Sequence, residues 1–216
     1  AGFRVGHGDR RNVNRATGRK EGKGTRDSLP GVTLGYSSGK TGYVFFDVQK
    51  AMRPAQSTQI IYGNRLNTEK AWNYEVGGRW FPNRQTTLGL TFYRIDFGNQ
   101  IEYDSTIISP SLGTPGSYIN LGATRYQGLE FSGDWALKNL PNLSFNAAYS
   151  FLDARQLNGA YQGNVVPYTS KHQLSGGATY QWGQTRFNIN GFWFSRSYTD
   201  AANTKRENAT GSVGRV

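Results

Sequence analysis

The 216-residue chain contains no cysteine, one methionine and two histidines. Without cysteine it forms neither disulfide bonds nor thiolate metal sites. Its apolar runs are very short, although 36% of its residues are hydrophobic, and its mean hydropathy is -0.63. A membrane-spanning helix needs about 20 mostly apolar residues in a row. The sequence therefore excludes a helical transmembrane span.

Apolar and polar residues instead alternate in segments of about ten residues, the length of a tilted strand that crosses a bilayer. The clearest pair of segments lies between Tyr126 and Tyr149, where Leu129, Phe131 and Trp135 share one face of the first run. A side-chain period of two is typical of β-strands, and the stretch KNLPN between the two runs suits a tight hairpin turn. One face is aromatic and aliphatic and the other is small and polar, as in the wall of a membrane β-barrel. The 28 glycines and 30 aromatic residues suit a curved sheet with aromatic girdles.

Short and long connections alternate along the chain. The short ones are SSGKTG, PNRQ, KNLPN and WGQ, and the long ones are five basic or Asn/Gly-rich stretches. Outer-membrane barrels have short periplasmic turns at one rim and long extracellular loops at the other, whereas a soluble sandwich would scatter its loop lengths over both ends. We therefore predict an all-β, transmembrane antiparallel β-barrel. About nine strands are predicted, at residues 1–5, 29–37, 43–52, 71–82, 86–103, 126–137, 143–151, 171–182 and 185–197.

Two segments depart from simple alternation. Residues 6–28 are polar and strongly basic without any period, and they predict a long flexible loop. In residues 86–103 the apolar set changes phase between Phe92 and Tyr93, which predicts either a β-bulge or a strand that continues into a tall extracellular hairpin. The final segment GSVGRV resembles the approach to another strand. Because nine is an odd number of strands and both ends are abrupt, we expect the chain to be an excerpt of a longer one.

The formal net charge of +11 allows two interpretations. Lysine and arginine can neutralise nucleic-acid phosphates, or they can attract anionic lipid headgroups or an anionic solute. The basic residues lie mainly in loops rather than strands, so we expect no nucleic acid among the partners. The basic residues of the first loop, which could steer anions or bind lipopolysaccharide phosphates, are Arg10, Arg11, Arg15, Arg19, Lys20, Lys23 and Arg26.

Several motifs in this order resemble those of TonB-dependent outer-membrane receptors, most closely the ferric citrate and ferric siderophore group. They are the E-x-G strand at Glu75–Gly77, the G-L-E triplet at Gly128–Glu130, and the N-x-V-P…S-x-K-H run from Asn164 to His172. The flanking segments LPGVTLGY, YVFFDVQKAMRPAQ, LSFNAAYSFLDA and ANTKRENATGSVGRV fit the same pattern, so that the resemblance covers roughly residues 29–216.

This resemblance implies a 22-stranded barrel in the outer membrane of a Gram-negative bacterium, closed by an N-terminal plug and energised through TonB. It implies a transporter for a ferric chelate rather than an enzyme, without a cofactor of its own. We expect residues 1–216 to be part of the barrel, with the plug, its TonB-coupling box and the C-terminal closing strands absent. Outer-membrane lipid and lipopolysaccharide are the other expected partners.

The candidate ligand-binding residues lie in two loops. In the family, the segment around Arg53 faces the ligand vestibule, and arginine is the side chain best shaped to hold the carboxylate oxygens of a ferric chelate. We select Arg53, Gln56 and Gln59, together with Asn203 and Lys205 in the last loop. The alternative is that Arg53 anchors the wall at the headgroup boundary and that the glutamines only solvate the loop.

Catalytic and metal sites are not indicated. His7 and His172 are far apart, no serine has a nucleophile elbow, and no cluster has metal-ligand spacing. Glu75 and Glu130 are expected to face the barrel interior and to form structural hydrogen bonds. The alternative classes of protein that fit the sequence are a passive porin or adhesin barrel, an outer-membrane hydrolase and a soluble basic β-sandwich.

Overall fold

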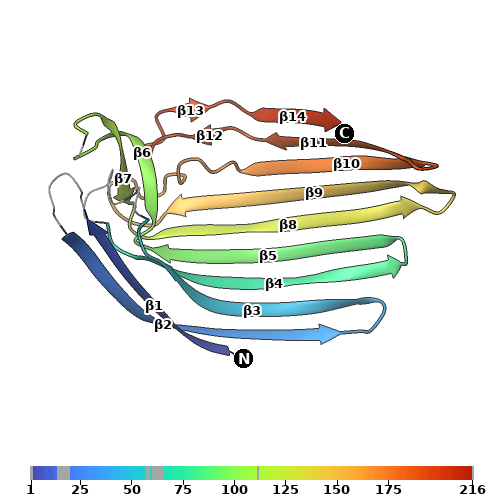
Figure 1. The fold of residues 1–216 in the computed structure, drawn as a ribbon, viewed down its shortest axis with the longest axis horizontal. Helices are drawn as coiled ribbons and strands as arrows, with labels where there is room; N and C mark the ends of the chain where they lie inside the picture. The colour runs from blue at the N-terminus through green and yellow to red at the C-terminus, as the bar shows by residue number, and fades with distance from the viewer. Residues whose placement is uncertain (1, 14–19, 57–58, 60–65, 111, 216) are drawn as a thin grey trace.

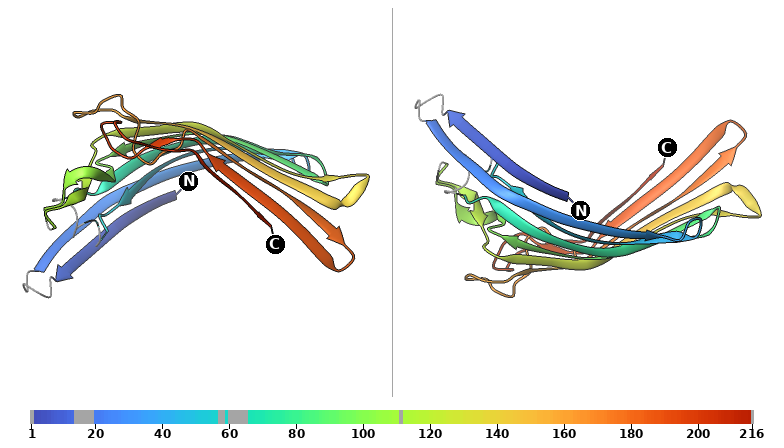
Figure 2. Two further views of the ribbon diagram at one scale, coloured as in Figure 1. Left: turned by 90° about the horizontal axis from the view of Figure 1, so that it is seen from above. Right: turned by 90° about the horizontal axis from the view of Figure 1, so that it is seen from below.

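The computed structural model describes residues 2–13, 20–56, 59, 66–110 and 112–215. Within these residues, ten strands form one antiparallel sheet in the order β1-β2-β3-β4-β5-β8-β9-β10-β11-β14 (Figure 1). The sheet is curved like a section of a cylinder wall (Figure 2). Its strands are β1 (Gly2–Val13), β2 (Lys20–Ser37), β3 (Gly42–Arg53), β4 (Glu69–Asn83), β5 (Thr86–Gly98), β8 (Thr124–Leu137), β9 (Leu140–Gln156), β10 (His172–Trp182), β11 (Thr185–Phe194) and β14 (Thr210–Arg215).

This architecture confirms the predicted all-β antiparallel wall, with one strand more than the nine predicted. The tenth strand is β14, which covers the GSVGRV segment. Each strand of the sheet pairs with the next sheet strand along the chain. No helix among the described residues is both long and apolar enough to cross a membrane.

The predicted alternation of connections is also confirmed. Four short turns, at residues 38–41, 84–85, 138–139 and 183–184, lie together at one rim of the sheet (Figure 1, right). The long connections lie at the opposite rim, and we call this the loop rim. Those between β3 and β14 span residues 54–68, 99–123, 157–171 and 195–209.

The prediction of a loop over residues 6–28 is wrong for most of that stretch. β1 and β2 pair continuously from Gly2 opposite Gly31 to Val13 opposite Lys20, while residues 14–19 lie outside the described part. Backbone hydrogen bonds form such a hairpin whatever the side chains are. Such a hairpin can therefore form without an apolar period in the sequence.

Of the two explanations predicted for the phase change in β5, the structure supports a strand that leads into a tall hairpin and not a β-bulge. β5 pairs without a register shift with β4 from Leu88 to Gly98 and with β8 along its length, and the irregularity lies between Trp80 and Asn83 of β4. The following long connection contains a two-stranded hairpin of its own, β6 (Ile101–Ile108) and β7 (Pro115–Asn120).

The two faces of the sheet differ as the alternation predicts. On β4 the apolar belt extends from Trp72 to Trp80, eight residue steps, or about 26 Å at about 3.3 Å per residue. Because the strands of outer-membrane barrels tilt by about 40°, this length covers about 20 Å of height, somewhat less than the apolar band of about 25 Å on such barrels. The large apolar side chains exposed on this outer face include Val32, Leu34, Tyr36, Val44, Phe46, Val76, Trp80, Leu90, Phe92, Leu174, Tyr180, Trp182, Phe187, Ile189, Trp193 and Val213.

The buried core lies outside the sheet, at the loop rim. Leu121, Ala154, Val166 and Ala201 are each at most 8% exposed and form one cluster. They come from three separate connections and the end of β9. We call residues 99–123, 157–171 and 195–209 the rim cap, because this cluster holds them together above the wall.

Candidate functional site

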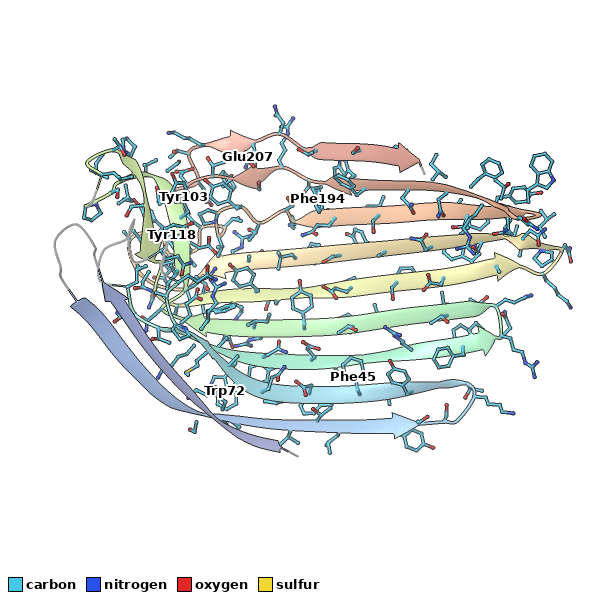
Figure 3. All side chains as sticks on the ribbon, viewed as in Figure 1. Phe45, Trp72, Tyr103, Tyr118, Phe194 and Glu207 are labelled. Carbon is cyan, nitrogen blue, oxygen red and sulfur yellow. The ribbon has the colours of Figure 1, made fainter. Side chains whose placement is uncertain are left out.

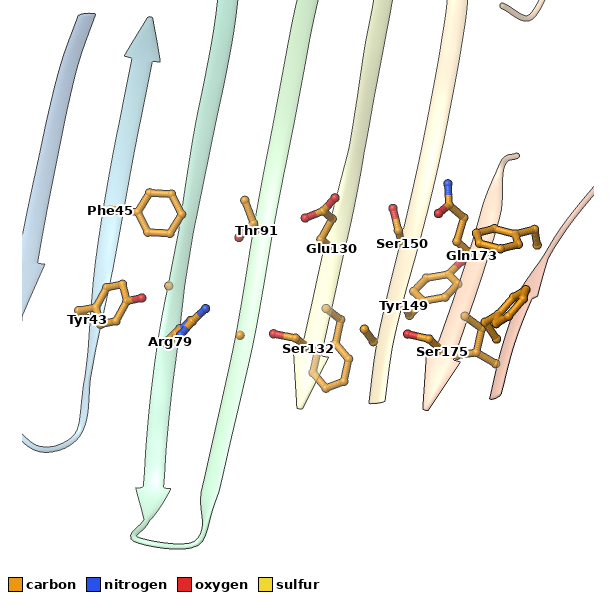
Figure 4. A pocket seen from close by; sticks show the side chains of 17 residues that line it. Tyr43, Phe45, Arg79, Thr91, Glu130, Ser132, Tyr149, Ser150, Gln173 and Ser175 are labelled. Carbon is orange, nitrogen blue, oxygen red and sulfur yellow. The ribbon is translucent and has the colours of Figure 1, made fainter. Parts of the chain in front are cut away.

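A groove of about 580 Å³ runs across the inner face of the sheet (Figure 4). The strand register forms two rows of side chains along it. One row contains Arg79, Ser132 and Ser175, and the other contains Glu130 and Ser150. This inner wall therefore offers hydrogen-bonding groups from strand to strand.

Two motif glycines permit close packing on this inner face. A Cβ on Gly77 would lie 2.7 Å from Thr91 Oγ1 and 2.8 Å from a backbone oxygen of β5. A Cβ on Gly128 would lie 2.9 Å from the Tyr93 hydroxyl and closer still to the Phe151 carbonyl oxygen. Neither position has room for a side chain, and this is a physical reason for glycine in the E-x-G and G-L-E motifs.

The predicted inner carboxylates face inward, and the partner of Glu75 is an amide. Glu75 accepts a hydrogen bond from Asn73 Nδ2 at 2.6 Å. Glu130 lines the groove.

Arg53 is the last residue of β3 and lies directly opposite Glu69, the first residue of β4. Its Nε donates to Glu69 Oε2 in an ion pair, and the Arg53 side chain stays 56% exposed while that of Glu69 is 2% exposed. The second carboxylate oxygen of Glu69 accepts the backbone N–H of Ile101 at 2.7 Å. The buried carboxylate thus fixes the base of an exposed guanidinium at the loop rim, on the inner side of the wall.

A buried network of polar side chains lies next to the Arg53–Glu69 ion pair. Gln100 Nε2 donates to Glu102 Oε1 at 2.7 Å and to the Tyr126 hydroxyl, and Thr124 Oγ1 donates to Gln100 Oε1. Burial raises the pKa of Glu102, while the hydrogen bond from Gln100 opposes this shift and the neighbouring carboxylate of Glu69 adds to it. The network ties the start of β6 to the top of β8.

Gln56 and Gln59 have different environments. Gln59 is only 8% exposed, and its Oε1 accepts the backbone N–H of Gln56 at 2.8 Å. It closes the turn after β3, so this oxygen is occupied. The Gln56 side chain is exposed beside Arg53 in the sequence. The structure thus leaves Arg53 and Gln56 accessible and gives Gln59 a structural contact.

Asn203 and Lys205 lie in the connection before β14, seven strands from β3 in the sheet order, so the structure does not bring them next to Arg53 (Figure 1). Asn203 fastens the rim cap. It accepts the N–H of Val165 at 2.7 Å and donates to the Val165 carbonyl at 2.9 Å. The Lys205 backbone N–H donates to Asp200 Oδ1 at 2.7 Å, while its side chain is exposed.

Asp200 organises this same turn. Its carboxylate is 1% exposed and also accepts from the backbone N–H and the hydroxyl of Thr204. Burial opposes ionisation, but the hydrogen bonds from Lys205 and Thr204 outweigh it and hold the pKa of Asp200 below its ordinary value.

Charged side chains also lie on the outer face, at the loop-rim end of the apolar belt. Asp96 Oδ1 accepts from Arg125 Nε at 2.6 Å, Asp96 Oδ2 forms an ion pair with Arg94 at 2.8 Å, and Asp153 pairs with Arg155 at 2.8 Å. These pairs lie on the outer face, whereas Arg53 lies on the inner face. His172, just below, shares a hydrogen bond with the Tyr149 hydroxyl at 2.9 Å, as expected of an interfacial residue.

Sequence analysis missed Glu69 and the rim-cap network. The Arg53–Glu69 pair depends on the register between β3 and β4, which are joined by a long connection, so the sequence offers no tight turn from which to count residue pairs. No sequence signal identifies the contacts of Asp200 and Asn203, because their partners are remote or are backbone groups. Within the described residues, no group of three or more His, Asp or Glu side chains could hold a metal ion.

Comparison with known proteins places this geometry in context. All residues, 1–216, match the family model described as TonB dependent receptor-like, beta-barrel. Among solved structures, the ferric citrate transporter FecA in its unliganded form is 24% identical with a TM-score of 0.77, covering 99% of this chain and 33% of that chain.

Two further receptors are similar in fold. The siderophore receptor PiuA from Acinetobacter baumannii is 17% identical with a TM-score of 0.71, covering 94% of this chain and 31% of its own. The ferric yersiniabactin uptake receptor FyuA from Yersinia pestis is 16% identical with a TM-score of 0.70, covering 91% and 30%. The chain thus spans about a third of the length of the structures it matches.

Proposed function

This chain belongs to the TonB-dependent receptor β-barrel family, whose barrels lie in the outer membrane of Gram-negative bacteria, and on that premise we propose that it is part of a receptor that takes up a ferric chelate. The apolar belt then faces lipid, and the inner groove faces the barrel lumen. The loop rim is the extracellular side, since outer-membrane barrels carry their long loops there. Its role is transport and not catalysis.

The observation that carries this proposal is the clamped guanidinium of Arg53. Ferric chelates built on carboxylates are anionic and present oxygen acceptors, and an arginine fork binds such oxygens through paired hydrogen bonds. Glu69 holds Nε of Arg53, which leaves the terminal nitrogens of its half-exposed side chain to a ligand. A side chain held in place by a buried partner loses less entropy on binding than a free one.

We propose a citrate-like carboxylate chelate as the ligand. The support is the chemistry of Arg53 and of the exposed amide of Gln56 three residues later, together with the similarity to a ferric citrate transporter. Asn203 and Lys205 contribute through the rim cap, Asn203 by shaping it and Lys205 by its exposed charge. Gln59 contributes indirectly, by closing the turn that presents Gln56.

Energy for uptake would come from TonB acting through a plug in the lumen, as the family implies. Lipopolysaccharide is a further proposed partner. The support is that Arg94, Arg125 and Arg155 lie on the outer face, at the loop-rim end of the apolar belt.

The test is a titration of the natural full-length protein in detergent, followed by intrinsic tryptophan fluorescence. Ferric citrate, iron-free citrate and a ferric hydroxamate are compared. Saturable binding of ferric citrate alone supports the citrate-like ligand, and binding of the hydroxamate alone keeps the receptor and rejects citrate. If no ferric complex binds, a passive porin or adhesin barrel becomes the better explanation.

Two variants test the role of Arg53. Arg53→Lys keeps the positive charge opposite Glu69 but removes the fork, so we expect the dissociation constant of ferric citrate to rise about tenfold. Arg84→Lys is the matched control, because Arg84 lies in a turn at the opposite rim. An unchanged affinity in Arg53→Lys would remove Arg53 from the site.

A further inference from the structure

A second, smaller pocket lies within the rim cap. Its volume is about 210 Å³, and it opens between the connections at residues 157–171 and 195–209. Phe194 lines both this pocket and the inner-wall groove, and Figure 3 labels Phe194 and Glu207. A group bound in this pocket therefore sits next to the lumen surface.

The pocket lining is polar and carries one sign of charge. Ser170, Ser197 and Asn208 supply hydroxyl and amide groups, and Glu207 is the only charged residue among the described residues that line it. Glu207 lies opposite Ser197 in the short ladder of β12 (Ser197–Tyr198) and β13 (Arg206–Glu207).

The cation next to Glu207 in the sequence is engaged elsewhere. The guanidinium of Arg206 lies over the ring of Tyr198, 4.3 Å from its centroid, and donates to the Tyr198 hydroxyl. Glu207 thus faces the pocket while Arg206 lies against Tyr198.

Tyr168 forms the aromatic side of the pocket. Its backbone has φ of 57°, a left-handed conformation that is unusual for a residue with a side chain. The conformation is held by its N–H, which donates to the Tyr198 carbonyl at 2.6 Å. The ring remains 43% exposed.

The Tyr168 hydroxyl lies in negatively charged surroundings. Burial raises the pKa of its hydroxyl, and the nearby Glu207, Tyr103, Asp104 and Glu102 raise it further. Two neighbouring tyrosines, Tyr103 and Tyr118, pack edge to face across the β6–β7 hairpin, with ring centroids 5.5 Å apart (Figure 3).

We propose that the pocket between Tyr168, Phe194 and Glu207 binds an ammonium group carried by the transported chelate. A carboxylate beside aromatic side chains attracts an organic cation by charge, and an aromatic ring adds to this attraction where the cation reaches its face. The serine hydroxyls and the Asn208 amide can accept the ammonium hydrogens. The volume suits a small head group, such as an aminoethyl end, and not a whole ferric complex. The inference rests on the proposed function, and it assigns a part of the ligand that citrate itself does not contain.

The experiment uses the natural full-length protein in detergent and a matched pair of small probes, 2-aminoethanol and ethylene glycol, measured by calorimetric titration. We expect the ammonium probe to bind about fivefold more tightly than the neutral one, the value of one exposed charge pair. Glu207→Gln should abolish this preference. Asp134→Asn, which removes the same charge near the opposite rim, should keep it. Equal binding of the two probes, no binding of either, or a preference that survives Glu207→Gln would overturn the inference.

A second arm separates this inference from the proposed function. The ferric complex of a citrate amide with a free aminoethyl end is compared with that of its N-acetyl derivative, in wild type and Glu207→Gln. Tighter binding of the free amine only in wild type supports the pocket, whereas equal binding of both chelates keeps the receptor and rejects the pocket. If neither chelate binds while the small ammonium probe does, the result supports the ammonium pocket and rejects the uptake of these chelates.

Discussion

Replacing Glu69 by alanine should loosen the junction where β3, β4 and β6 meet. The Ile101 N–H would lose a hydrogen bond to a buried carboxylate, a loss of about 1.5–3 kcal/mol. The ion pair to Arg53 adds little, because that side chain is 56% exposed and exposed pairs contribute about 0–1 kcal/mol. We therefore expect local opening at Ile101 to become easier by about 2 kcal/mol, which corresponds to amide exchange about thirtyfold faster.

The assay is hydrogen–deuterium exchange of the full-length protein in detergent, read on peptides that contain residues 99–105. Two variants divide the contributions. Glu69→Gln keeps an acceptor oxygen for Ile101 and should exchange only a few times faster than wild type. Arg53→Gln removes the ion pair but leaves the Ile101 contact, and should also have a small effect. Unchanged exchange in Glu69→Ala, or an equal effect of Arg53→Gln, would refute the assignment of Glu69 as the residue that holds this junction.

Three further outcomes are expected. Gly128→Ala should lower the urea midpoint of unfolding by an amount equivalent to about 2 kcal/mol or more. The reason is that the new Cβ would lie less than 3.0 Å from backbone atoms. Gly98→Ala is the control and should leave the midpoint unchanged, because nothing lies within 4 Å of a Cβ at that position. Leu90→Arg on the outer face should cost about 2–4 kcal/mol in bilayers, while arginine at the adjacent inward-facing Thr91 should be tolerated; equal costs would contradict the two-faced wall. The hydrogen bonds to the Asp200 carboxylate should stabilise the rim cap above the ordinary pKa of 3.8 and lose this effect as the pH falls through the lower folded value, so proteolysis of residues 195–209 should rise in that acid range in wild type but not in Asp200→Asn.

The wall could be predicted from the sequence because each of its strands has one face toward lipid and one toward water. Side chains point alternately to these two faces, so apolar and polar residues alternate along the strand with a period of two. The faces of Phe131 and Leu174 and the positions of the short turns follow from that single constraint. Hairpins at the loop rim escape this constraint, and for this reason the pattern predicts a loop over residues 6–28, where the structure pairs β1 with β2, and does not predict strand β7.

The site was only partly predictable for a related reason. The chemistry of Arg53 as an anion-binding residue follows from its type and its place at the end of a strand. Its fixation by Glu69 depends on strand register, and the structural use of Gln59 and Asn203 depends on folded loops. A side chain can form a hydrogen bond with the backbone of any residue. The residue type of the partner therefore does not reveal such a contact in the sequence.

The sheet has a consequence for how the chain folds. Every strand pairs with its predecessor in the sheet, so the wall can assemble hairpin by hairpin from contacts of short sequence separation, as in a linear repeat array. The rim cap is different: the N–H of Ala201 donates to Asp104 Oδ2 at 3.4 Å across 97 residues. Closure of such a contact requires the intervening hairpins to be in register, so the extracellular loops should become ordered last and should report on the completion of the wall beneath them.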